Sequence, residues 1–151
     1  MIQKILKNKS QIFLVALAVI GFSIIRNYED SIFYDPLLSF FHSDFSSQPL
    51  PEMIKWKLIL NLFWRYLINT ILSVFIIFVL FKSKGFVKLA TVLYTVFFVI
   101  LMLLFLLVLH FFSDKLMVLF YIRRFLIQPL FLLLFVPGFY FQQYDLKKLK
   151  S

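Results

Sequence analysis

The sequence predicts an all-α integral membrane protein with four transmembrane helices, both termini in the cytoplasm and one longer extracytoplasmic loop. Three observations lead to this fold class. The chain is 62% hydrophobic with a mean hydropathy of +0.94, which is typical of chains that cross lipid and not of a soluble domain. Its apolar residues fall into four long runs. Its basic residues gather mainly at the ends of those runs.

Composition also excludes several classes of function. The chain has no cysteine, so disulfides, thiolate metal sites and cysteine nucleophiles are excluded. A net charge of +9 invites a nucleic-acid partner. We reject that interpretation because the basic residues flank apolar runs, where membrane topology accounts for them.

The four apolar runs are candidates for spanning helices, which need roughly 20 residues each. The first run is short, and a basic start before a brief apolar run also describes a signal peptide. Its small-x-small site Ala16-Leu17-Ala18 lies in the middle of the run, so we expect an uncleaved anchor. A single membrane domain, residues 1–151, is expected to contain spans at about residues 10–26, 58–81, 89–112 and 116–141.

The distribution of lysines predicts the orientation of these spans. Lysines gather in the N-terminal segment, in the turn at residues 82–88 and in the C-terminal tail, and the positive-inside rule places such segments in the cytoplasm. Four spans would put all three segments on one side of the membrane, so the number of spans and the distribution of lysines agree. The loop at residues 27–57 and the short turn at 113–115 are then extracytoplasmic. The lysines of these three segments are Lys4, Lys7, Lys9, Lys82, Lys84, Lys88, Lys147, Lys148 and Lys150.

The extracytoplasmic loop contains the stretch SIFYDPLLSFFHSDF, residues 31–45. In it, Asp35 can cap a helical turn and Pro36 can open that turn. Aromatic and aliphatic residues surround this step. Two locations are open for the segment: it lies in the membrane interface with its aromatics toward lipid, or it packs over the ends of the helices.

The second span carries a polar stripe. Asn61, Arg65, Asn69 and Ser73 are each four residues apart, and four-residue steps on an α-helix drift by only about 40° each. The opposite face of this span is apolar. We therefore expect the stripe to face other helices.

The fourth span carries two adjacent arginines, Arg123 and Arg124, followed by Gln128 and Pro129. Adjacent helical residues point about 100° apart, and Gln128 lies one turn from Arg124 on the same side. Pro129 has no amide hydrogen and frees the carbonyl near residue 125. With Gln128, that loosened turn offers acceptors close to the arginines.

Depth in the membrane connects these two spans. Counting about 20 residues back from their cytoplasmic ends places Arg65 and the Arg123–Arg124 pair at nearly the same depth, near the outer boundary. We expect these three cations to converge there. No acid lies within any span, so the compensating anion is an acid of the loop, a lipid phosphate or another ligand, since arginine binds both carboxylate and phosphate bidentately. The candidate anion- or partner-binding residues are Arg65, Arg123, Arg124, Asn61, Asn69, Gln128 and Asp35, with Asp35 the first choice of acid.

Three segments resemble the exosortase F system-associated proteins, small multi-spanning bacterial membrane proteins whose genes accompany an exosortase. The segments are FYDPLLSFF, NLFWRYLINTILSVFIIFVLF and FYIRRFLIQPLFLLLFVPGFYFQ. The resemblance implies an accessory role near a membrane transpeptidase in the bacterial cytoplasmic (inner) membrane. It also implies that this chain is not the exosortase itself, whose catalytic set includes a cysteine. The informative positions are Asp35-Pro36, Arg65-Tyr66, Asn69, Arg123-Arg124 and Gln128-Pro129.

We therefore expect a non-enzymatic accessory protein that contacts an exosortase, or the transmembrane sorting signal of its substrate, through the arginine cluster. Membrane lipids are further expected partners, and no cofactor or metal is expected. The alternative is a protein that binds an anionic lipid, or an enzyme acting on a phospho-lipid, at the outer leaflet. The only histidines, His42 and His110, belong to no catalytic motif, and no HExxH, GxSxG or P-loop pattern is present. A structural protein without a ligand is a third possibility.

Overall fold

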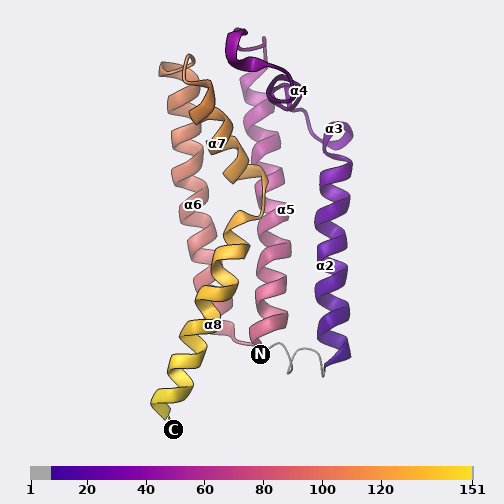
Figure 1. Ribbon diagram of the computed structural model, residues 1–151, viewed down its shortest axis with the longest axis vertical. Coiled ribbons are helices and arrows are strands. Elements are labelled where there is room, and N and C mark those ends of the chain that lie inside the picture. The colour runs from indigo at the N-terminus through magenta and orange to yellow at the C-terminus, as the bar shows by residue number, and fades with distance from the viewer. Residues whose placement is uncertain (1–7, 151) are drawn as a thin grey trace.

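The computed structural model describes residues 8–150, which form α-helices joined by short connections. Lys4 and Lys7, used above to predict orientation, lie outside the described residues. Figure 1 shows long upright helices beside a bent helical pair, with a group of short helices at one end. In chain order the elements are α2 (Lys9–Asn27), α3 (Glu29–Ile32), α4 (Pro36–His42), η1 (Phe45–Ser47), α5 (Lys55–Phe81), α6 (Lys84–Phe111), α7 (Leu116–Ile127) and α8 (Leu130–Lys150).

Three of these helices, α2, α5 and α6, are each long and apolar enough to cross a membrane. They confirm the predicted spans at residues 10–26, 58–81 and 89–112 as helices. The predicted fourth span is not one straight helix: α7 and α8 are separate and bent by 60°. As a pair they meet the same criterion, so the chain has three or four candidate spans and the architecture of a multi-pass membrane protein.

The bend in the fourth segment has a local cause. Pro129 cannot donate a backbone hydrogen bond, and its ring disfavours helical geometry in the residue before it. Gln128 is accordingly extended, with φ −109° and ψ 144°. The sequence identified the proline and a loosened turn, but the predicted span at residues 116–141 ran through it without a break.

The helices extend beyond the apolar runs that predicted them. α6 begins at Lys84, so the predicted turn at residues 82–88 contracts to Lys82 and Ser83. Lys82 closes α5 in the left-handed region, with φ 50°. α8 continues to Lys150, well past residue 141. Hydropathy marks the part of a helix that suits lipid, whereas the backbone hydrogen bonds that define the helix can continue into a charged segment.

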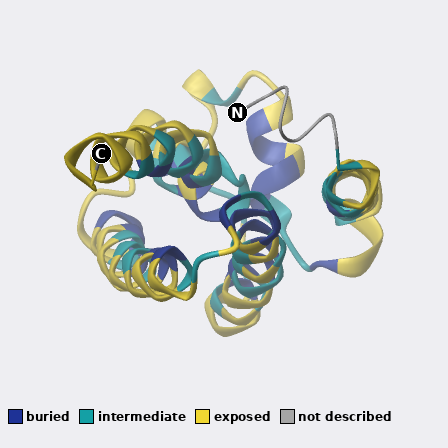
Figure 2. Cartoon of the chain, turned by 90° about the horizontal axis from the view of Figure 1, so that it is seen from below, coloured by how far each residue is buried: buried dark blue, intermediate teal, exposed yellow. Residues whose placement is uncertain are grey.

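α5 lies at the centre of the bundle and packs against α2, α6 and α7. α2 approaches it through small residues: Ala18 is buried, and Gly21 lies against the side chain of Leu72. Small residues allow membrane helices to approach closely. Ala18 is the only buried residue of α2, and Figure 2 shows this helix standing apart and exposed on most sides. α2 is therefore the least enclosed of the long helices.

The loop between α2 and α5 folds over one end of the bundle. Pro36 begins α4, as predicted, and four apolar residues of this short helix are buried. Phe41 contacts Phe120 of α7 edge to face, with 5.2 Å between ring centroids. Of the two predicted locations, the structure has the loop packed over the helix ends. The apolar side chains that suggested an interfacial segment are Leu37, Leu38, Phe40 and Phe41, and they are buried in the protein.

Candidate functional site

The site is centred on the carboxylate of Asp35, at the start of α4. Arg65 of α5 donates from Nη1 to Oδ2 of Asp35 over 2.8 Å. Arg123 of α7 donates from Nε to Oδ1 over 3.4 Å and from Nη2 to Oδ2. The side chains of Asp35, Arg65 and Arg123 are only 2%, 2% and 4% exposed. One loop acid therefore joins two helices that lie far apart in the sequence.

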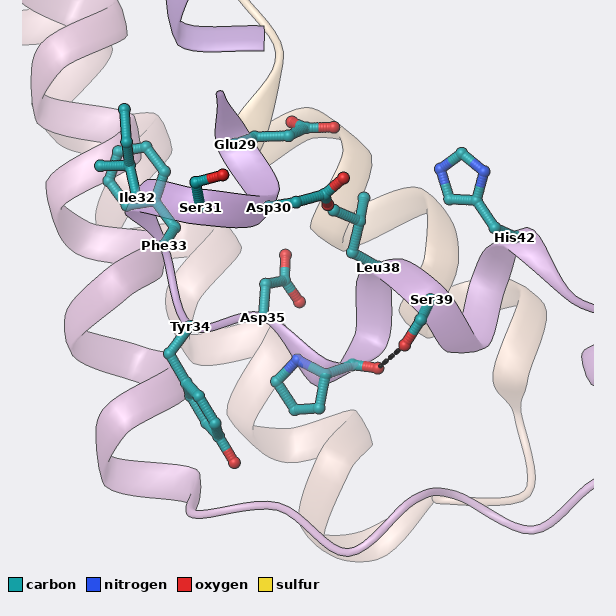
Figure 3. Close-up of a pocket in the computed structure, with 11 residues that line it drawn as sticks. Glu29, Asp30, Ser31, Ile32, Phe33, Tyr34, Asp35, Leu38, Ser39 and His42 are labelled. Carbon is teal, nitrogen blue, oxygen red and sulfur yellow. Dashed lines mark hydrogen bonds between the residues drawn. The ribbon is translucent and has the colours of Figure 1, made fainter. Parts of the chain in front are cut away.

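Glu29, in α3, completes the charge balance. Its Oε2 accepts a hydrogen bond from Nη2 of Arg65, and its side chain is 15% exposed. Two carboxylates thus face two guanidinium groups, so the repulsion between Arg65 and Arg123 is offset. Figure 3 shows Glu29 and Asp35 at neighbouring turns of the loop, with the Tyr34 ring pointing away from them. We call these four residues, Glu29, Asp35, Arg65 and Arg123, the ionic cluster.

Aromatic rings cover both arginines of the ionic cluster. The guanidinium carbon of Arg65 is 5.3 Å from the ring centroid of Phe33, and that of Arg123 is 5.9 Å from that of Phe41. These distances fall in the range of cation–π attraction. The rings also exclude solvent, which strengthens the ionic hydrogen bonds beneath them. The loop therefore supplies the acids of the cluster and the apolar cover above it.

Capping of α4 differs from the prediction. Asp35 occupies the N-cap position, but its side chain makes no capping hydrogen bond. Its carboxylate is engaged by the two arginines, whose full positive charges attract it more strongly than the partial charge of a backbone N–H group does. Ionic pairing therefore takes precedence over capping at this residue.

Arg124 does not join the other two arginines, contrary to the prediction of a three-cation cluster. It is exposed, and its Nε donates to Oε1 of Gln128 over 3.1 Å. The reason is the angle of about 100° between adjacent helical residues: when Arg123 points inward to Asp35, Arg124 must point elsewhere. The predicted placement of Gln128 on the same side as Arg124 is confirmed.

The polar stripe on α5 faces the interior of the protein, as predicted. Arg65, Asn69 and Ser73 are buried, and Asn61 is partly buried. On the opposite face, Ile71 is 59% exposed. Oδ1 of Asn61 accepts the backbone N–H of Tyr34 over 3.2 Å, which fastens the loop close to the ionic cluster.

Asn69 binds a freed backbone carbonyl, a role that we had predicted for the arginines. Its Nδ2 donates to the carbonyl of Ile127, at the end of α7, over 2.8 Å. The last carbonyls of a helix lack intrahelical partners, and the break at Pro129 exposes this one. We predicted that a freed carbonyl near residue 125 would serve the arginines. The structure instead pairs Asn69 with Ile127, so α5 holds the broken end of α7.

The sequence predicted part of this site and missed part. Asp35, Arg65 and Arg123 meet, as expected from depth and charge, and Asn61, Asn69 and Gln128 lie around them. Glu29 lies in the loop at residues 27–57 but was not among the candidate residues selected from the sequence. Its position directly after the first span was the available signal, because that position fixes it near the start of α5 and of α7, at the same end of the bundle.

Comparisons with family models, curated proteins and solved structures found no match. The fold and the site define the class of protein: a multi-pass helical membrane protein whose loop is fastened to its bundle by a buried ionic cluster. Both carboxylates of the cluster already accept hydrogen bonds from arginine. The arrangement is therefore suited to fixing the positions of α3, α4, α5 and α7 at one end of the molecule.

Proposed function

We propose that this protein is a non-enzymatic accessory protein of an exosortase-type protein-sorting system in a bacterial inner membrane. In this role it contacts the exosortase or the transmembrane sorting signal of its substrate. One observation carries the proposal. The positions on which the resemblance rests, including Asp35, Arg65 and Arg123, come from three distant segments and meet at one end of the bundle. That convergence supports a shared functional role for residues that are scattered along the chain.

The proposed topology has four spans and both termini in the cytoplasm. The first described residues and the end of α8 lie at the same end of the bundle, together with the connection between α5 and α6 (Figure 1). That end carries the lysine-rich segments, which supports a cytoplasmic location for it. Reporter fusions after residue 45 should report the outside, and fusions after residue 86 or at the C-terminus should report the inside. An outside C-terminus would contradict this topology.

The ionic cluster satisfies its own charges, so we place the partner contact beside it. α2 is the best-supported surface, because it exposes large apolar side chains over most of its length, Leu17, Ile20 and Ile24 among them. These three lie on one face of the helix, at spacings of three and four residues. In lipid, helices associate through packing and hydrogen bonds and not through the hydrophobic effect. A second membrane helix can therefore pack on α2 at little desolvation cost.

Copurification tests the proposal. Tagged full-length protein from native membranes is expected to recover the exosortase or one of its substrates. Replacing Leu17, Ile20 and Ile24 with alanine should lower that recovery several-fold, because packing area on α2 is lost. A matched control replaces Val92, Val96 and Val99, equally exposed on one face of α6, and should leave recovery unchanged. Recovery of neither protein by the unaltered chain would refute the proposal.

A further inference from the structure

We propose that a cleft between α2 and α7 binds the phosphate group of a membrane phospholipid. The cleft has two adjoining lobes. The upper lobe, about 250 Å³, is lined by residues of α2, α4 and α7 that include His42, Arg123 and Arg124. The lower lobe, about 220 Å³, reaches Arg65, Asn69 and Pro129 at the break between α7 and α8. Both lobes are lined by Arg26, Glu29, Ile127 and Gln128, so they lie side by side.

The charge of the cleft is not balanced by the protein. Four arginines line it, Arg26, Arg65, Arg123 and Arg124. The two acids of the ionic cluster offset two of these charges, which leaves +2. Within residues 8–150, Arg26 forms no ion pair, and Arg124 bonds only the neutral Gln128. Asp30 lines a neighbouring pocket of the loop and not this cleft.

A second observation points to a ligand in the lower lobe. Arg65 lines this lobe and is 2% exposed, yet its Nε has no hydrogen-bond partner within the protein. A buried donor left unpaired costs free energy. Its two Nη atoms donate to Asp35 and Glu29, so Nε is the one nitrogen of this guanidinium that has no acceptor within residues 8–150.

The lining of the cleft identifies the chemical class of the ligand. Arginine forks match the oxygens of a phosphate group, and the unpaired charge lies on Arg26 and Arg124. The lower lobe adds an apolar wall from α2, formed by Val19, Phe22 and Ile25. A ligand with a phosphate and an acyl chain fits both parts, whereas inorganic phosphate would leave the apolar wall uncovered. A phospholipid of the surrounding leaflet has this combination.

The experiment titrates the full-length protein, purified in dodecyl maltoside, with phosphatidylglycerol and follows binding by native mass spectrometry. Diacylglycerol, which lacks the phosphate, should bind at least about tenfold more weakly. The Arg26→Gln/Arg124→Gln variant should lose about tenfold in affinity for phosphatidylglycerol, which corresponds to one or two charge-assisted hydrogen bonds. The matched control, Lys55→Gln/Lys115→Gln, removes the same charge from two exposed lysines at the end of the bundle where α4 lies. It should bind phosphatidylglycerol as the unaltered protein does.

A further variant separates a lipid from a free anion. Ser23 lines the lower lobe and is exposed, so Ser23→Phe should fill that lobe and weaken phosphatidylglycerol binding without affecting the folded structure. Inorganic phosphate that binds as tightly as the lipid, and is insensitive to Ser23→Phe, would overturn the assignment to phospholipid. Undiminished lipid binding by Arg26→Gln/Arg124→Gln, or an equal loss in the lysine control, would overturn the phosphate site.

Discussion

Asp35→Ala is expected to abolish accumulation of the protein in the membrane. Without this carboxylate Arg123 has no acid partner and Arg65 retains only Glu29, so an uncompensated charge stays buried beside a like charge. Breaking a buried ion pair by removing one partner costs about 3–5 kcal/mol, which is a large part of the stability of a typical domain. Asp35→Asn should be nearly as damaging, because an amide can accept a hydrogen bond but cannot neutralise an arginine.

The amount of each variant in isolated membranes, and its melting temperature in detergent, measure this effect. Asp44→Ala is the matched control: it removes an exposed acid of the same loop that forms no ion pair within residues 8–150. It should accumulate normally. Equal accumulation of Asp35→Ala and Asp44→Ala would show that the ionic cluster does not stabilise the fold.

The second large effect is expected at Arg123, with its neighbour as the control. Arg123→Gln leaves Glu29 and Asp35 to share one arginine, and a surplus carboxylate that is 2% exposed should destabilise the protein by about 3 kcal/mol or more. Arg124→Gln removes the same charge from the next position. It should cost little, because that side chain is exposed and bonds only Gln128.

Arg65 offers a finer comparison within the same prediction. Its two Nη atoms reach two different acids, and lysine keeps the charge but lacks the planar fork. Arg65→Lys should therefore fall between the unaltered protein and Arg65→Gln in melting temperature. The interpretation would be wrong if Arg124→Gln proved the most damaging of the arginine variants.

Several parts of the fold and site followed from the sequence because they depend on local periodicity. Apolar length gave the spans, four-residue spacing identified the buried face of α5, and matched depth brought Arg65 and Arg123 together. Asp35 was the first choice among the loop acids, and the structure places its carboxylate between the two arginines. Each of these inferences uses only helix geometry and the cost of burying charge.

Other features depend on tertiary contacts that spacing does not specify. The choice of Glu29 over Asp30 is set by how α3 turns after α2. Whether Arg123 or Arg124 faces inward depends on the rotation of α7 about its axis. Only packing fixes that rotation. The hydrogen bond from Asn69 to the exposed carbonyl of Ile127 depends on how α7 packs against α5.

A double-mutant cycle between Asp35 and Arg123 tests the ionic cluster most directly. Asp35→Leu alone leaves a surplus of positive charge, and Arg123→Met alone leaves a surplus of negative charge, whereas the double variant leaves the neutral pair Arg65–Glu29. Contacting residues typically couple by about 0.5–3 kcal/mol, and apolar replacement of a whole buried pair can be neutral. The double variant should therefore melt at a higher temperature, and accumulate to a higher level, than Asp35→Leu alone. Losses that simply add in the double variant would contradict direct pairing of Asp35 with Arg123.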